Sequence, residues 1–154
     1  MSRNPAYHLW LSTRDMARIG WLMLNEGQWN GVSVIDREWA KQIVSVVTPV
    51  GQMNPERRRS GYFGYGYMWW VWDGPAATGP FKGAYTARGA IGQWITVLPA
   101  AGLVIAHKTN SKYERTTSWP SYEKLLELIL GAHGVKPAGR SEEHTSELQS
   151  RFGI

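Results

Sequence analysis

The amino-acid sequence predicts an α+β domain in which an antiparallel sheet is packed by helices. Capped, amphipathic helical segments stand near both ends of the chain, and short apolar segments separated by glycine-containing turns fill the middle. The order helix, helix, strands, helix is typical of layered α+β structures. An apolar share of 43% is ordinary for a globular protein and argues against disorder.

The first helix is expected to begin at Ser12. The segment Ser12-Thr13-Arg14-Asp15 fits a capping box, in which a hydroxyl and an acid satisfy the free amides of a helix start. Apolar residues then recur at helical spacing until Gly27 supplies a stop. Asn30-Gly31 is typical of a tight hairpin turn, because both residues tolerate positive φ. Asp36 can cap a second helix, whose inner face is predicted to hold Trp39, Ile43 and Val44.

The middle of the chain predicts strands. Alternation over 62–72 places large apolar side chains on one face and Gly64 and Gly66 on the other, so another backbone is expected to approach those glycines closely. Further strands are predicted at 84–88, 93–98 and 103–108. Both faces of these strands are largely apolar, so the sheet should be covered on each side. Pro120 and Ser121 open a last helix, whose predicted buried stripe is Tyr122, Leu125, Leu126, Ile129 and Leu130.

The last residues differ in composition from everything before them. Residues 140–150 hold three glutamates and no aromatic ring, and their reverse translation resembles a common sequencing-library adapter read in frame. We therefore interpret 140–154 as a non-native tail and exclude it from the fold. An adapter read in frame indicates that the reading frame came from a short assembled contig. Because such contigs truncate genes, we expect 1–139 to be the C-terminal fragment of a longer domain.

Composition and spacing exclude several classes of function. Without cysteine there is no disulfide, no thiolate metal site and no cysteine nucleophile. The histidines lack metal-ligand spacing, so neither a metal nor a cofactor is expected. No apolar run is long enough to span a membrane. The net charge of +5 is scattered apart from the run 57–59, so no nucleic-acid interface is predicted. No signal-peptide core follows Met1, and a periplasmic or secreted parent stays open.

One segment matches a catalytic motif formally. Ser121-Tyr122-Glu123-Lys124 fits Ser-x-x-Lys, in which the lysine amine lies one helical turn after the serine and takes its proton. We interpret it as structural, because Ser121 fits a helix start and Lys124 is flanked by Glu123 and Glu127. The chain is therefore expected to hold no nucleophile of its own.

The most informative stretch is 83–110. It resembles the active-site strand and following hairpin of the serine β-lactamase-related family, which includes class C β-lactamases, DD-peptidases, esterases and 6-aminohexanoate-dimer hydrolases. Other segments resemble that family in the right order, and together they span nearly all of residues 10–133. These segments are Leu11-Ser12-Thr13-Arg14-Asp15-Met16-Ala17-Arg18, Trp29-Asn30-Gly31, Val34-Ile35, Glu38-Trp39, Tyr65-Gly66-Tyr67 and Trp69-Trp70.

The resemblance implies that Ala87-Arg88-Gly89 takes the place of the family's third catalytic motif, Lys-Thr-Gly or a variant. Gly89 would let substrate backbone lie against the strand, and the amide of Ala90 would be one of two oxyanion-hole donors. Ala87, Arg88, Ile91 and Gly92 are the expected substrate-binding residues. An alanine at 87 departs from the cationic or aromatic residue of true β-lactamases and favours an amidase or esterase. Arg88 either binds a substrate carboxylate or points to solvent.

The resemblance further implies a serine hydrolase that acts through an acyl-enzyme on an amide or ester, such as a β-lactam, a peptide or a small ester. The family's Ser-x-x-Lys and Tyr-x-Asn (or Tyr-x-Ser) motifs precede these segments, and neither occurs upstream here. The chain alone is therefore expected to be inactive and to expose a surface where the missing part packs.

Two alternatives remain at this point. One is a non-catalytic binding module for peptidoglycan or a glycan, with tryptophan platforms at Trp69, Trp70, Trp72 and Trp94. The other, a nucleic-acid binder, has only the net charge in its favour. If part of the sheet's cover is missing, Trp70 and Trp94 should be more exposed than tryptophans usually are.

Overall fold

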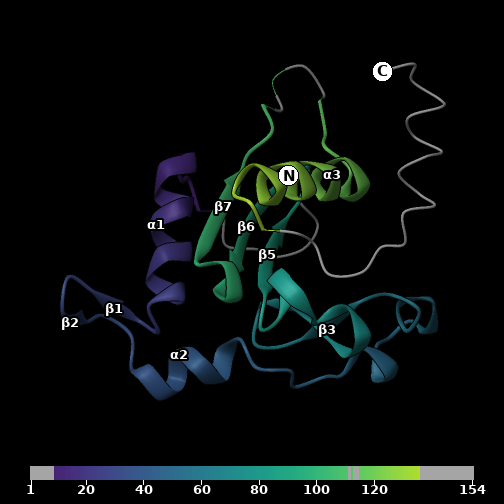
Figure 1. The fold of residues 1–154 in the computed structure, drawn as a ribbon, viewed down its shortest axis with the longest axis horizontal. Helices are drawn as coiled ribbons and strands as arrows, with labels where there is room; N and C mark the ends of the chain where they lie inside the picture. The colour runs from purple at the N-terminus through teal and green to yellow at the C-terminus, as the bar shows by residue number, and fades with distance from the viewer. Residues whose placement is uncertain (1–8, 111, 113–114, 136–154) are drawn as a thin grey trace.

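A five-stranded antiparallel sheet forms the centre of the molecule. The computed structural model describes residues 9–110, 112 and 115–135, so the interpretation of 140–154 lies outside the described residues. Helix α1 covers one face of the sheet and helix α3 the other (Figure 1). The predicted α+β class is confirmed. In the order of the sheet, the strands are β3 (Phe63–Tyr65), β4 (Trp70–Trp72), β5 (Tyr85–Gly89), β6 (Gln93–Leu98) and β7 (Leu103–His107).

The N-terminal elements follow their local signals. Helix α1 (Thr13–Leu24) begins after Ser12, whose Oγ accepts from the amide of Asp15 at 3.1 Å. Asn30 and Gly31, both at positive φ, turn β1 (Gln28–Trp29) back onto β2 (Val32–Ser33). Asp36 caps helix α2 (Arg37–Ile43) through the amide of Trp39 at 2.9 Å.

One expected core position in α2 was wrong. Trp39 is 46% exposed and packs on Tyr67 at the surface, with 5.5 Å between ring centroids. Ala40 occupies the core instead. A small side chain at the contact lets the short helix lie close to its neighbours, which an indole there would prevent.

Residues 62–72 do not form the single strand that their alternation predicted. They form the hairpin of β3 and β4, and Met68 adopts φ 69° between the two strands. The predicted close approach at the glycines is confirmed. A Cβ on Gly64 would lie 2.8 Å from the carbonyl oxygen of Thr48, and a Cβ on Gly66 would lie 2.6 Å from that of Ile43.

The face covered by α1 holds one of two apolar clusters. Gly20 lets the helix approach the sheet, since a Cβ there would lie 2.9 Å from Cγ2 of Ile95. Because a second cluster fills the other face, the expected two-sided cover is confirmed. The buried members on the α1 side are Met16, Met23, Ala40, Trp69, Val71, Tyr85, Ile95 and Val97.

Helix α3 (Trp119–Ala132) packs on the other face through Tyr122, Leu126 and Leu130, which are all fully buried. Leu125 was expected in this stripe but is exposed, because side chains spaced four apart form a narrow line of contact with the sheet. The expected exposure of Trp94 was also wrong. Trp94 is 4% exposed because Tyr122 stacks on it, with ring centroids 4.3 Å apart, while Trp70 is half-buried.

A buried chain of hydroxyls ties α3 to two strands. Tyr122 donates to Oγ1 of Thr96 at 2.8 Å, and Thr96 shares a 2.9 Å hydrogen bond with Oγ1 of Thr86. All three residues are fully buried. Burial raises the pKa of Tyr122 to about 12, so its hydroxyl stays protonated and keeps its role as a donor at neutral pH.

Candidate functional site

Strand β5 has an open edge at its C-terminal end. It pairs with β6 along its whole length, but β4 pairs with it only at Tyr85 and Thr86. On the side of β4, Ala87, Arg88 and Gly89 therefore have no strand partner among the described residues. The backbone polar groups along this edge can pair with an extended ligand.

The turn after β5 ends this open edge with an unused amide. Ala90, Ile91 and Gly92 connect β5 to β6, and the last two adopt φ 65° and 82°. Ala90 is exposed. Within the described residues, its amide donates to no protein acceptor. An N–H at this position is available to a ligand that lies along the edge.

The turn is held firmly from the side of β7. The carbonyl oxygen of Gly92 lies 2.9 Å from Nδ1 of His107, which donates because a carbonyl only accepts. Oγ1 of Thr109 donates to the same oxygen at 3.2 Å and lies 2.8 Å from Oγ1 of Thr117. The backbone of Thr117 packs against Gly92, where a Cβ would lie 2.7 Å from the carbonyl oxygen of Thr117. These contacts hold Gly92, two residues after Ala90.

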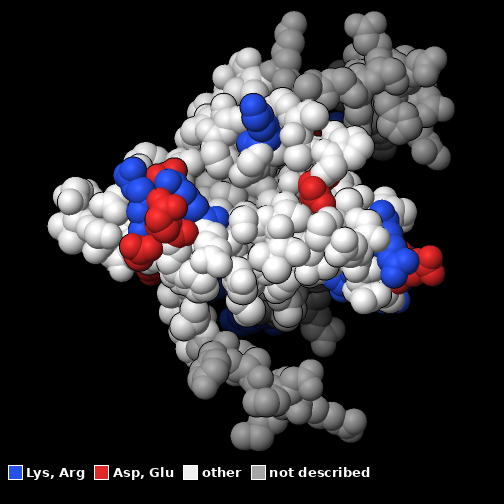
Figure 2. All heavy atoms as spheres, turned by 90° about the horizontal axis from the view of Figure 1, so that it is seen from below, with Lys and Arg blue, Asp and Glu red and all other residues white. Residues whose placement is uncertain are grey.

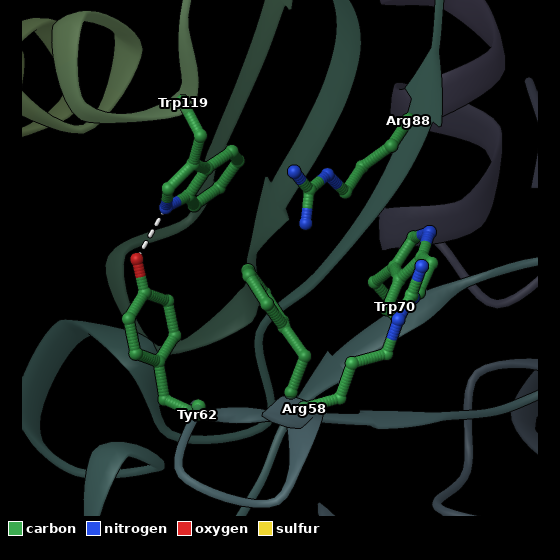
Figure 3. A pocket seen from close by; sticks show the side chains of 7 residues that line it. Arg58, Tyr62, Trp70, Arg88 and Trp119 are labelled. Atoms are coloured by element: carbon green, nitrogen blue, oxygen red, sulfur yellow. Dashed lines mark hydrogen bonds between the residues drawn. The ribbon is translucent and has the colours of Figure 1, made fainter. Parts of the chain in front are cut away.

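Arg88 is exposed, but its guanidinium packs against aromatic rings. It leaves the sheet on the α3 face, where its Cζ lies 4.6 Å from the centroid of Trp119, 5.4 Å from that of Trp70 and 5.5 Å from that of Phe63 (Figure 3). These rings surround a cavity of about 470 Å³, which we call the arginine–aromatic pocket. Its lining is Arg58, Gly61, Tyr62, Phe63, Trp70, Arg88 and Trp119.

The pocket is basic and its rim is hydrogen-bonded. Desolvation against the rings, together with the charge of Arg58, lowers the pKa of Arg88. No carboxylate in the described part of the chain forms an ion pair with either arginine. Tyr62 accepts a hydrogen bond from the indole N–H of Trp119 (Figure 3). Tyr62 also donates to Glu123 at 2.9 Å. Burial raises the pKa of Tyr62 to about 12.

The structure places the predicted site residues on one strand end but not on one face. Ala87 packs against the α1-side core, whereas Arg88 enters the pocket on the α3 face. Ile91 is 48% exposed at the turn, and Gly92 is buried. Sequence reasoning named Trp70 only as a possible glycan platform and missed the remaining lining residues of the pocket. Their only signal was the abundance of tryptophan and tyrosine.

Both residues of the formal Ser-x-x-Lys match contact other side chains at the start of α3. Oγ of Ser121 lies 2.9 Å from Oγ of Ser118, the N-cap of α3, and Nζ of Lys124 lies 3.8 Å from the carboxylate of Glu127. The lysine is thus paired with an acid. In the described ranges, no three His, Cys, Asp or Glu residues lie close enough to hold a metal ion.

Charged side chains of both signs lie on one face of the molecule. The face drawn in Figure 2 carries basic and acidic side chains in mixed groups separated by uncharged surface. Arg37 and Lys41, for example, pair with Glu26. A continuous basic stripe is therefore not present on this face. No helix in the described part of the chain is long and apolar enough to cross a membrane.

Comparison with known proteins identifies the family. The family model for beta-lactamase matches residues 1–126, so the chain belongs to the beta-lactamase family of hydrolases. The resemblance seen in the sequence is confirmed.

Two relatives illustrate the likeness. An uncharacterised protein of Alkalihalophilus pseudofirmus is 28% identical over 109 residues, which cover 68% of this chain and 31% of that protein. A solved structure from Bacillus anthracis, described as a 6-aminohexanoate-dimer hydrolase, superposes with a TM-score of 0.55 at 22% identity. That likeness concerns the fold, and it covers 81% of this chain and 30% of the other. The chain spans less than a third of the length of either relative.

Proposed function

We propose that this chain is the C-terminal part of a serine hydrolase that cleaves an amide or ester through an acyl-enzyme, with the end of β5 as one wall of the active site. The observation that carries the proposal is the edge at 87–89, which lacks a strand partner among the described residues and ends at the amide of Ala90, for which those residues supply no acceptor. Attack on a carbonyl places negative charge on its oxygen. A fixed N–H aimed at that charge stabilises the transition state by about 3–4 kcal/mol. Membership of the beta-lactamase family supports this assignment.

Each residue of the turn has a part in the proposed site. Gly89 brings no side chain to the edge, so a substrate backbone can lie against it. The bonds from His107 and Thr109 to Gly92 hold the turn, so the amide of Ala90 need not reorganise during the reaction. Ile91 offers an exposed apolar contact to the substrate.

The substrate is proposed to be a peptide, a small amide or an ester rather than a penicillin-type β-lactam. Ala87 brings no charge and no ring to the edge, and its side chain packs into the α1-side core. A cationic group that would attract the carboxylate of a penicillin is therefore lacking at that position.

The nucleophile, its base and the second oxyanion donor are proposed to come from a part of the parent protein N-terminal to these segments. Trp21 on α1 is 50% exposed and Trp10 is 97% exposed. Large apolar side chains at the surface support a face against which that part packs.

The purified chain is expected to hydrolyse neither a chromogenic cephalosporin nor a p-nitrophenyl ester above the buffer rate, and to take no label from a fluorophosphonate probe. The reason is that Ser121 is bonded to Ser118 and Lys124 is paired with Glu127. Mass spectrometry of the treated protein measures the label. Stoichiometric labelling that disappears in Ser121→Ala would contradict this expectation.

The alternative, a glycan-binding module with tryptophan platforms, has less support. Trp69, Trp72 and Trp94 are between 4% and 8% exposed, so their faces are not available to a sugar. Trp70, the fourth proposed platform, lines the arginine–aromatic pocket.

A further inference from the structure

We propose that the arginine–aromatic pocket is a binding site for an organic carboxylate that has an aromatic or aliphatic group. The pocket lies on the α3 face of the sheet, on the other side from Ala87 and helix α1. Strand β5 contributes Arg88, the segment around β3 and β4 contributes Arg58, Tyr62 and Trp70, and α3 contributes Trp119 (Figure 3). The inference goes beyond the proposed hydrolysis and does not depend on it.

The charge of the pocket favours an anion. Arg58 and Arg88 line the same cavity and each lies over the ring of Trp70, with Cζ 4.9 Å and 5.4 Å from its centroid. Two guanidinium groups close together repel one another. The described residues contribute no paired carboxylate to offset this repulsion. A bound anion would offset the repulsion between the two guanidinium groups. The planar guanidinium of an arginine can donate two parallel hydrogen bonds to a carboxylate.

The walls define the rest of the ligand. Phe63, Tyr62, Trp70 and Trp119 present rings to a cavity of about 470 Å³, a volume typical of small-molecule sites. The indole N–H of Trp119 donates to Tyr62, and the hydroxyl of Tyr62 donates to Glu123. The polar groups of both side chains are therefore already hydrogen-bonded at the rim. The wall is therefore suited to an apolar part of the ligand. Inorganic phosphate would meet the arginines but leave the rings without a partner.

Packing makes Arg88 a fixed recognition element. Its guanidinium lies within 4.6–5.5 Å of three ring centroids, although the residue as a whole is exposed. Cation–π contacts of this kind hold the group in place without using its N–H donors. Those N–H donors therefore remain available to a ligand.

The test is a titration of the chain with 4-phenylbutyrate, followed by calorimetry and by the indole N–H resonance of Trp119 in NMR. Saturable binding that shifts this resonance is expected. The matched amide, 4-phenylbutyramide, and inorganic phosphate should each bind at least about tenfold more weakly. The amide lacks the negative charge, and phosphate lacks the apolar group.

Variants then assign the binding to Arg88. Arg88→Gln should weaken binding of 4-phenylbutyrate at least about tenfold, since a charge-assisted pair of hydrogen bonds is lost. Arg57→Gln makes the same change of charge next to Arg58 but outside the lining, and should change the affinity by less than about twofold. Arg88→Lys keeps the charge and loses the planar fork, so it should fall between these two.

Several results would overturn the proposal. These are equal affinity for the carboxylate and its amide, phosphate binding as tight as that of 4-phenylbutyrate, or unchanged affinity in Arg88→Gln. A thermal melt of each variant shows that it is folded. If Arg88→Gln does not fold, Arg88→Lys decides the matter, because unchanged affinity there contradicts bidentate recognition. Absence of hydrolysis by the chain bears only on the proposed function.

Discussion

Replacing Thr96 by valine is expected to lower the free energy of unfolding by about 2–4 kcal/mol. Valine has nearly the same shape, so the loss comes from hydrogen bonding and not from packing. The change removes the acceptor for Tyr122 and the partner of Thr86, both fully buried. A buried polar group without a partner costs about 1–3 kcal/mol. Tyr122 is left without its acceptor, and Thr86 keeps only the longer hydrogen bond of 3.4 Å to the carbonyl oxygen of Ala87. Urea denaturation followed by tryptophan fluorescence measures the change.

Tyr122→Phe is the matched control for the hydroxyl chain. It removes one hydroxyl and leaves the pair of Thr86 and Thr96 intact. Its cost should therefore be smaller, about 1 kcal/mol. A loss below about 0.5 kcal/mol for Thr96→Val would show that these hydroxyls do not tie α3 to the sheet.

Replacing Gly92 by alanine is expected to destabilise the chain by about 2–4 kcal/mol, because positive φ strains alanine and the added atom overpacks the turn. Gly92 adopts φ 82°, and a Cβ would lie 2.7 Å from the carbonyl oxygen of Thr117 and 2.9 Å from its amide nitrogen. Either the turn or the segment before α3 must then move. The amide resonance of Ala90 should shift in NMR as the turn is displaced.

Gly102→Ala separates strain from packing. Gly102 also adopts positive φ, 62°, but a Cβ there would meet nothing within 4 Å. Its cost should be that of backbone strain alone, about 1–2 kcal/mol. If Gly92→Ala cost no more than Gly102→Ala, the turn would not be held by the segment before α3.

Local chemistry predicted much of the fold. The caps at Ser12 and Asp36, the turn at Asn30-Gly31 and the close approaches at Gly64 and Gly66 each depend on residues next to one another or on a missing side chain. The errors arose where tertiary contact decides. Met68 adopts positive φ with no signal in the sequence and divides the strand predicted over 62–72.

Periodicity alone also could not select the line of contact on a helix. In α3 it predicted Leu125 alongside Leu126, and in α2 it predicted Trp39 where Ala40 is buried. Trp94 was expected to be exposed because part of the sheet's cover was thought to be missing. Helix α3 covers it through the ring of Tyr122.

The candidate site also has a part that the sequence predicted and a part that it did not. The resemblance located the end of β5, because the motif at Ala87-Arg88-Gly89 is continuous in the sequence. The arginine–aromatic pocket was not foreseen, since Arg58, Tyr62 and Trp119 come from separate segments that only the folded chain brings to Arg88.

The most direct test of the proposed serine hydrolase is the genomic DNA upstream of the codon for Met1. The account predicts that the reading frame continues and encodes a Ser-x-x-Lys motif followed by Tyr-x-Asn or Tyr-x-Ser, the groups that would supply the nucleophile and base opposite Ala90. An in-frame stop codon directly before Met1 would contradict it and would leave a free-standing binding protein as the better reading.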